Sequence, residues 1–171
     1  MQGTLSPSVS AALWSSRPTV GDLMVLGEEN YALLSRLVPG LPTRRGLLVS
    51  RVSGAVDLHL TVESQSPYTT VVRLTHVFAD GEAGRSAFGS DPDVQLRVYH
   101  DARQVEVLDL RQTALPLHAD YQPPALDSKW RLSLFLCKWL SYCLYQGHRF
   151  ASASAAWVPL AEDDDLACPC G

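Results

Sequence analysis

The adjacent residues His100 and Asp101 form the first place in the sequence where chemistry could occur. A carboxylate can orient an imidazole whose pKa lies near neutrality, which is typical of general acid or base catalysis. Adjacent residues of a strand, however, point to opposite faces, and an Asp that opens a type I turn commonly accepts hydrogen bonds from backbone amides. We therefore predict that Asp101 caps a turn, that His100 ends an apolar strand face with a backbone group as its partner, and that neither is catalytic.

Hydroxyl, guanidinium and ring groups gather in the same part of the sequence, on segments typical of two adjacent hairpins. Together they suit an anionic or nucleotide-like ligand, since guanidinium groups bind carboxylates and phosphates through paired hydrogen bonds. Thr and Tyr are also good strand formers, so strand structure alone explains their presence as well. The candidate ligand-binding residues are Tyr68, Thr69, Thr70, Arg73, Arg97, Tyr99, His100 and Asp101.

The four cysteines indicate neither a disulfide framework nor a complete metal site. Cys168 and Cys170 supply two thiolates, which is half of a four-ligand zinc site, and no Cys/His pair lies nearby in sequence. Cys137 and Cys143 lie in an apolar segment and are predicted to be small core residues. Phosphate-loop, nucleophile-elbow and His-Glu-x-x-His motifs are absent from the sequence, so we predict no metal, no cofactor and no catalytic residue.

Charge and hydropathy narrow the expected partners. The chain of 171 residues has 14 Lys+Arg and 18 Asp+Glu, so its net charge is −4, and the acidic run 162–165 alone accounts for that excess. A neutral body gives no global attraction to nucleic acid or anionic lipid, because such binding needs a basic patch that outweighs the acidic groups around it. The most apolar stretch, Leu132–Tyr145, is shorter than the roughly 20 residues of a membrane span, and the N-terminus lacks a secretory pattern. We expect a cytoplasmic protein that binds neither nucleic acid nor membrane.

Helical periodicity marks two segments. Apolar residues recur at helical spacing over Val20–Val38, and Pro39-Gly40 ends the run, which predicts an amphipathic helix. A second helix is predicted to begin at an N-cap of Asp127 or Ser128 and to stop at Gly147. Its apolar residues cover most of its circumference, so it needs two partners: the sheet, and either the first helix or a second subunit.

Alternation of polar and apolar residues predicts an antiparallel meander, in which a weakly marked strand over Gly46–Val52 precedes four clearer ones. The last two strands form a hairpin around the turn Asp101–Gln104, which makes Arg97 and Glu106 diagonal neighbours on one face. Ala79–Asp93 is predicted to be a long loop and Leu115–Leu126 an extended connector. The four clearer strands, each pairing with the next, are Val56–Glu63, Tyr68–Val77, Val94–His100 and Gln104–Leu110.

Three segments carry a family resemblance. They are Val62-Glu63-Ser64 with Tyr68-Thr69-Thr70, then Leu96 to Ala102, then Phe135-Leu136 with Trp139-Leu140, Tyr142-Cys143-Leu144 and Gly147-His148. Together they resemble the YqiB-like proteins, a small proteobacterial family that carries a domain-of-unknown-function label. The resemblance covers about Asp22 to His148, and Tyr99-His100-Asp101-Ala102 is its most specific part. It implies a soluble cytoplasmic protein and assigns no activity.

These patterns predict an α+β fold, with an N-terminal helix, an antiparallel meander of four to five strands, and a long C-terminal helix packed on the sheet. A single domain is expected over residues 20–150. A flexible segment 1–19 precedes it, and an Ala/Ser-rich, acidic tail 151–171 follows it.

Two functions remain open at this point. The first is a non-enzymatic binding or adaptor module that acts through its sheet surface or its apolar helix. A homodimer or a protein partner at that helix is expected, because surplus apolar surface usually finds a partner. The second is a small hydrolase or a sensor of an anionic, nucleotide-like ligand, which would use the Tyr/Arg/His hairpin surface. The lack of a nucleophile or metal motif in the sequence favours the first.

Overall fold

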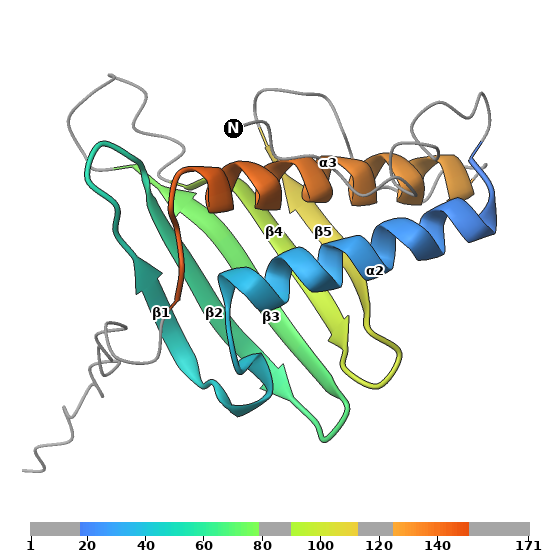
Figure 1. The fold of residues 1–171 in the computed structure, drawn as a ribbon, viewed down its shortest axis with the longest axis horizontal. Helices are drawn as coiled ribbons and strands as arrows, with labels where there is room; N and C mark the ends of the chain where they lie inside the picture. Colours follow the sequence, from blue (N-terminus) through green and yellow to red (C-terminus); the bar gives the residue numbers. More distant parts are fainter. Residues whose placement is uncertain (1–17, 79–89, 113–124, 151–171) are drawn as a thin grey trace, which may run out of the picture.

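The computed structural model describes residues 18–78, 90–112 and 125–150, in which two α-helices lie against one face of a five-stranded sheet (Figure 1). This arrangement confirms the predicted α+β fold. In chain order the elements are α2 (Val20–Leu37), the short 3-10 helix η1 (Leu41–Thr43), β1 (Gly46–Ser50), β2 (Asp57–Gln65), β3 (Thr69–Val77), β4 (Ser90–Tyr99), β5 (Gln104–Arg111) and α3 (Ala125–Tyr145).

The sheet is an antiparallel meander in the order β1-β2-β3-β4-β5, so each strand pairs with its neighbour in sequence, as predicted. Alternation along β3 shows which face is covered: Thr70, Val72, Leu74 and His76 are buried, and the residues between them are half-exposed. His76 contacts Trp139 of α3, so the buried side chains face the helices. We call the other side of the sheet the open face, because no helix of the described residues covers it.

The start of β4 differs from the prediction. It begins at Ser90 instead of Val94, because Val77 pairs with Ser90 and Thr75 with Asp93 across a register shift. The added residues include Asp and Pro, which are depleted in strands, so the sequence did not indicate this part of β4. The last four residues of the predicted loop Ala79–Asp93 therefore belong to β4. Residues 79–89, most of the predicted connector, the predicted tail, and residues 1–17 of the predicted flexible N-terminal segment lie outside the described residues. The last residue of that segment, Thr19, is described and forms the N-cap of α2.

A capping box begins α2 at the predicted position. The Thr19 hydroxyl accepts a hydrogen bond from the Asp22 amide at 3.2 Å, and the Asp22 carboxylate accepts one from the Thr19 amide at 2.8 Å. This backbone hydrogen bond holds the pKa of Asp22 below its ordinary value. The helix ends at Leu37, and Gly40 then adopts the left-handed conformation (φ 72°) that lets the chain turn into η1.

The start of α3 was predicted too late. The helix begins at Ala125, so Asp127 lies in the first turn instead of at the cap. Its carboxylate pairs with Arg131, one turn further on, at 2.9 Å. An acidic residue in the first turn is favoured by the helix dipole, which is why Asp127 resembled a cap in the sequence. The helix ends at Tyr145, and Gly147 with φ 92° follows as the predicted stop.

Helix α3 is covered on two sides, by the sheet and by α2. Leu136 and Leu140 are fully buried, and the Asn30 amide of α2 donates a hydrogen bond to the Ser133 carbonyl of α3 at 3.0 Å. Of the two alternatives for the second partner of this helix, the structure thus contains the first helix. Within the described residues, neither helix has the length and apolarity of a membrane span.

We expect Thr19→Ala to lower the free energy of unfolding by about 1 kcal/mol, because the substitution removes the hydroxyl that caps α2. Urea unfolding followed by circular dichroism measures the effect. Ser35→Ala is the control, since Ser35 is exposed in the same helix and an exposed Ser→Ala change there is expected to be within about 0.5 kcal/mol of neutral. Equal stability losses in the two variants would contradict the role of the cap.

Candidate functional site

The predicted ligand residues do not form one surface, because they are divided between the two faces of the sheet. Side chains alternate along a strand, so consecutive residues such as Thr69 and Thr70 point in opposite directions. Thr70 and His100 lie on the covered side and are joined to each other by a hydrogen bond. On the open face lie Thr69, Arg73, Arg97 and Tyr99, while Tyr68 and Asp101 are exposed near the strand ends. Ligand binding by these residues remains a prediction.

Arg73 on the open face is held by two carboxylates. Its guanidinium lies 2.8 Å from Glu63 Oε1 and 3.0 Å from Asp93 Oδ2, and the Gln95 amide donates to Glu63 Oε2 at 2.6 Å. Hydrogen bonding to Glu63 raises the pKa of Arg73. An anionic ligand would have to displace these carboxylates to reach the guanidinium, so the structure assigns Arg73 to an internal ionic network.

Glu106 on β5 is the centre of a second ionic cluster. Its Oε2 accepts a hydrogen bond from the Tyr99 hydroxyl at 3.1 Å and lies 3.9 Å from Arg97 Nη1. Its Oε1 accepts one from Lys129 of α3 at 3.1 Å. Arg97 and Glu106 are direct partners instead of the predicted diagonal neighbours, because the turn starts at His100 and pairs Tyr99 with Gln104.

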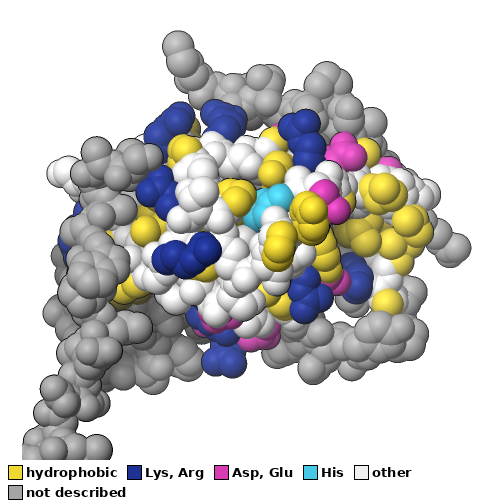
Figure 2. All heavy atoms as spheres, turned by 90° about the horizontal axis from the view of Figure 1, so that it is seen from below, with side chains coloured by type: hydrophobic (Ala, Val, Ile, Leu, Met, Phe, Trp, Pro, Cys, Tyr) yellow, Lys and Arg dark blue, Asp and Glu magenta, His cyan; other side chains and the backbone are white. Residues whose placement is uncertain are grey.

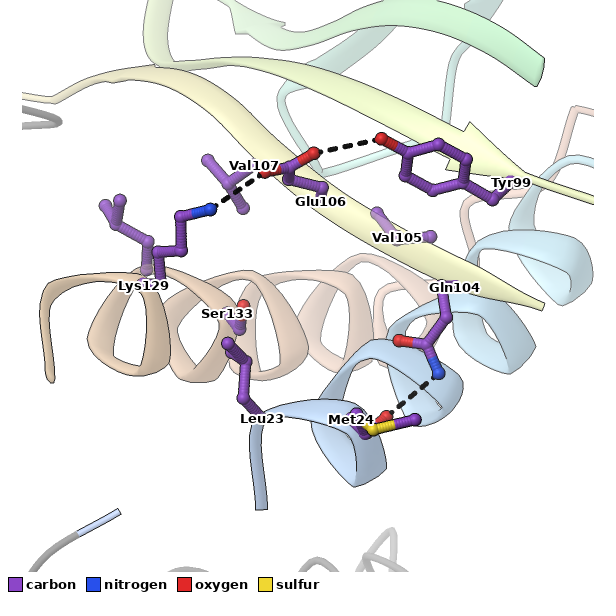
Figure 3. Close-up of a pocket in the computed structure, with 10 residues that line it drawn as sticks. Leu23, Met24, Tyr99, Gln104, Val105, Glu106, Val107, Lys129 and Ser133 are labelled. Carbon is purple, nitrogen blue, oxygen red and sulfur yellow. Dashed lines mark hydrogen bonds and ion pairs between the residues drawn. The ribbon is translucent and has the colours of Figure 1, made fainter. Parts of the chain in front are cut away.

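A pocket of about 210 Å³ opens beside this cluster, between α2, α3 and β5 (Figure 3). Its walls are mainly apolar and include Leu23 of α2, Val105 and Val107 of β5, and Leu132 of α3. Tyr99, Glu106 and Lys129 form its polar rim, and the Ser133 side chain also lines it. The sequence gives no sign that Lys129 and Ser133 line a pocket, because only the packing of α3 beside β5 brings them to this place.

Gln104 forms one wall of the pocket by lying across α2. Its amide donates a hydrogen bond to the Met24 carbonyl at 3.2 Å. The side chain passes directly over Gly27, where a Cβ atom would overlap the Gln104 amide oxygen. A glycine inside a helix normally costs about 1 kcal/mol relative to alanine, so its presence here has a packing reason.

His100 lines a second pocket, of about 130 Å³, between α2, η1 and the end of β4. Its Nε2 bonds to the Thr70 hydroxyl at 2.8 Å, so its partner is a side chain instead of the predicted backbone group. Burial lowers the pKa of His100 although Asp101 opposes the shift, which keeps the imidazole neutral near pH 7. Asp101 accepts a hydrogen bond from the Ala102 amide at 2.8 Å, as predicted for a turn-capping residue. Figure 2 shows this end of the molecule, where basic side chains are spread around the surface.

A buried histidine cluster lies between the sheet and α3. The Trp139 indole donates to His76 Nδ1 at 3.4 Å, and Cys143 Sγ lies 3.7 Å from His76 Nε2. Burial, with repulsion from His148 as a second cause, lowers the pKa of His76 to about 4. Burial raises the pKa of the Cys143 thiol to about 12, so this thiol stays protonated and packs as the predicted core residue.

His148 connects the chain after α3 to β1. Its Nδ1 lies 3.0 Å from the Ser50 hydroxyl, which itself accepts a hydrogen bond from the Arg149 amide at 3.3 Å. Both side chains are buried, and the His148 ring centroid is 6.1 Å from that of His76. In the part of the chain that the structure describes, no three His, Cys, Asp or Glu residues are arranged to hold a metal ion.

We expect the protein to lose stability below neutral pH through His76. The pKa of this side chain is about 4 when folded and 6.5 in its ordinary state, so between these values the unfolded chain binds more protons. Stability is therefore full above about pH 6.5 and falls toward pH 4, by on the order of 3 kcal/mol for this group. His76→Gln removes most of this slope in urea unfolding at a series of pH values. Burial also lowers the pKa of His59, on the open face of β2, but by less, so His59→Gln serves as a comparison and is expected to remove a smaller part of the slope. An unchanged slope in His76→Gln would refute the assignment.

His100→Ala and Arg97→Ala are expected to differ in stability. The first removes the hydrogen bond to Thr70 and the edge contact with Tyr31, which costs on the order of 1 kcal/mol. The second removes an exposed ion pair at 3.9 Å and is expected to leave the urea midpoint unchanged. If Arg97→Ala unfolds as early as His100→Ala, Arg97 has a structural role that its contacts do not explain.

Comparison with known proteins supports a family assignment. The family model described as "Protein of unknown function (DUF1249)" matches residues 33–149. The chain is 31% identical over 134 residues to the "Uncharacterized protein YqiB" of Escherichia coli strain K12, and the same holds for strains O6:H1 and O157:H7. These matches cover 76% of this chain and 91% of each relative. No solved structure matches the chain. The family model spans more than half of the chain, so the protein belongs to the DUF1249 family, together with the YqiB proteins of E. coli.

Proposed function

We propose that the protein is a non-enzymatic binding module that holds a small amphipathic carboxylate in the pocket between α2, α3 and β5. The observation that carries this proposal is the combination of apolar walls with a charged rim in the larger of the two pockets. Concave, mainly apolar sites with a few converging polar groups are the usual binding sites for small molecules. The pocket uses both the apolar helix and the sheet, the two surfaces expected to bind.

The charge at the rim favours an acid. Lys129 and Arg97 bring two positive charges to the single carboxylate of Glu106, so the cluster has one positive charge in excess. The Lys129 side chain is 54% exposed, and exposed ion pairs contribute only about 0–1 kcal/mol. Lys129 can therefore turn from Glu106 to a ligand carboxylate at little cost, whereas Arg73 is held by two partly buried carboxylates.

The size of the pocket indicates a short apolar body. Its volume of about 210 Å³ lies below the roughly 300–1,000 Å³ that is common for drug-sized ligands. Leu23, Val107 and Leu132 offer contacts to methylene groups and no hydrogen bonds from their side chains. A chain of a few carbons with a carboxylate at one end matches this lining.

The chemistry of the buried nucleophile-type residues supports binding over catalysis. Burial raises the pKa of the Cys137 thiol to about 11 and that of Cys143 to about 12, so neither forms the reactive thiolate near neutral pH. The Ser50 hydroxyl is buried and engaged with His148 and the Arg149 amide. The hydrolase alternative would need a nucleophile or an activated water elsewhere.

A homodimer or protein partner at α3, in the cytoplasm, remains a second proposal. Tyr142 and Tyr145 are 51% and 77% exposed on this helix, and aromatic residues are enriched in protein interfaces. Because α2 already covers one side of α3, the apolar surface left for a partner is smaller than the sequence suggested. Sedimentation at micromolar concentration tests it: a single species of 18.7 kDa would exclude self-association under those conditions.

The binding proposal is tested with hexanoate, hexanol and hexylamine, by thermal shift and by ¹H–¹⁵N correlation spectra. We expect hexanoate to raise the melting temperature most and to shift amide signals of β5 and the first turns of α3, because a ligand of the folded state stabilises it. Lys129→Gln is expected to weaken hexanoate binding by about 3- to 10-fold through loss of a charge-assisted hydrogen bond, without weakening hexanol binding.

Two further variants make the test specific. Lys138→Gln removes a charge on an exposed part of the same helix, outside the pocket lining, and is expected to leave binding unchanged. Val107→Phe fills the pocket and is expected to abolish binding of all three compounds. Equal responses to hexanoate and hexylamine, or binding that survives Val107→Phe, would overturn the proposed site.

A further inference from the structure

Ser133 places a hydroxyl inside the mainly apolar pocket. The residue lies on α3 and is only 5% exposed, yet it lines the pocket (Figure 3). Its hydroxyl makes no hydrogen bond within the described residues, although its backbone carbonyl accepts one from Asn30. The bond that a helical serine often makes to the carbonyl four residues earlier, here that of Lys129, is absent as well.

The Ser133 hydroxyl is open to the pocket, since it is not among the fully enclosed side-chain atoms of the described residues that lack a hydrogen-bond partner. A polar group at such a place is hydrogen-bonded to water or to a ligand. Alanine has the higher helix propensity and would leave the apolar walls of the pocket continuous, whereas serine adds a hydroxyl to these walls. This hydroxyl has no bond to the described protein to give up, so a ligand can bond to it in place of water.

Asn30 brings an unsatisfied buried group to the same helix contact. It is fully buried in α2, and its amide nitrogen donates to the Ser133 carbonyl at 3.0 Å. Its side-chain oxygen has no hydrogen-bond partner in the described structure. Two polar groups with unused hydrogen-bonding capacity therefore belong to one contact between α2 and α3, beside the apolar wall formed by Leu132.

We propose that the ligand of this pocket is a short hydroxy acid, with its carboxylate at Lys129 and a hydroxyl at its other end bonded to Ser133. This inference rests on the proposed function and adds the identity of the buried end of the ligand. A hydroxyl fits because it donates and accepts at once, and so pairs with the serine hydroxyl in either orientation. A second carboxylate there would be desolvated without a cation, which is costly.

The positions of the two residues set the length of the ligand. Lys129 and Ser133 are four residues apart on α3, which places them on the same side of the helix about 6 Å apart along its axis. Lys129 extends to Glu106 at the rim, and Ser133 remains close to the helix backbone. A short carbon chain therefore reaches both groups, in agreement with the small pocket volume of about 210 Å³.

The experiment compares 6-hydroxyhexanoate and 4-hydroxybutyrate with hexanoate on the wild-type chain, by titration monitored in ¹H–¹⁵N spectra. We expect at least one hydroxy acid to bind about 5-fold more tightly than hexanoate and to shift the Ser133 amide signal. In Ser133→Ala this preference disappears, and hexanoate binds as tightly as to wild type or more tightly. Ser141→Ala, on the same helix but outside the pocket lining, keeps the wild-type preference.

Urea unfolding of Ser133→Ala in the absence of ligand provides a second measurement. We expect its midpoint to equal or exceed that of the wild type, because the hydroxyl makes no hydrogen bond to the described protein and alanine has the higher helix propensity. A lower midpoint would show that the hydroxyl has a structural role, and would overturn the inference.

The binding outcomes separate the two proposals. If hexanoate binds as well as both hydroxy acids to the wild type, the role of Ser133 is wrong while the carboxylate pocket stands. If none of the three compounds binds, both proposals fall.

Discussion

Burial of α3 between α2 and the sheet is the interaction on which the rest of the structure depends. Leu132, Leu136 and Leu140 lie along one side of this helix and are almost completely buried, and each contributes roughly 1.5–3 kcal/mol on burial. The sheet alone cannot cover a helix that is apolar around most of its circumference. The hydrogen bond from the Asn30 side chain to the α3 backbone contributes to the alignment of the two helices.

The larger pocket is a consequence of how α2, α3 and the sheet meet at β5. Gln104 reaches across α2 to the Met24 carbonyl, and this is possible only because Gly27 has no side chain. Lys129 reaches from α3 to Glu106 on the other side. Long polar side chains thus bridge the helices and the edge strand, and the space between them is lined by apolar residues that they do not fill.

Electrostatics distinguishes Arg73, in the middle of the open face, from the two cations beside Glu106. Arg73 is enclosed by Glu63 and Asp93, so its charge is neutralised within the sheet. Arg97 and Lys129 share the single carboxylate of Glu106. The positive charge that no carboxylate of its own cluster balances is therefore at the edge of the sheet beside α3, and not in the middle of the open face where arginine and hydroxyl residues are concentrated in the sequence.

Local patterns in the sequence were sufficient for the fold. Period-two alternation and consecutive turns predicted the meander, and the helical spacing that ends at Pro39-Gly40 predicted α2 almost to the residue. Both signals depend on neighbours within a few residues. Two boundaries were predicted wrongly because the local signal is ambiguous. Asp127 suits a helix cap and a first turn equally, so the start of α3 was placed too late. Asp and Pro are rare in strands, so the start of β4 was placed too late as well.

Only the tertiary structure determines which residues come together in the candidate site. The predicted ligand residues share two hairpins, but strand alternation separates Thr70 and His100 from Arg73 and Arg97, so closeness in sequence did not produce one surface. The pocket combines side chains from α2, α3 and β5, which meet only after the apolar faces of the helices pack. A sequence determines by itself those features that nearest neighbours control, such as periodicity, caps and turns. Which distant polar groups come together depends on the register and packing of whole elements, because residues such as Lys129 and Glu106, 23 positions apart, carry no local sign of their contact.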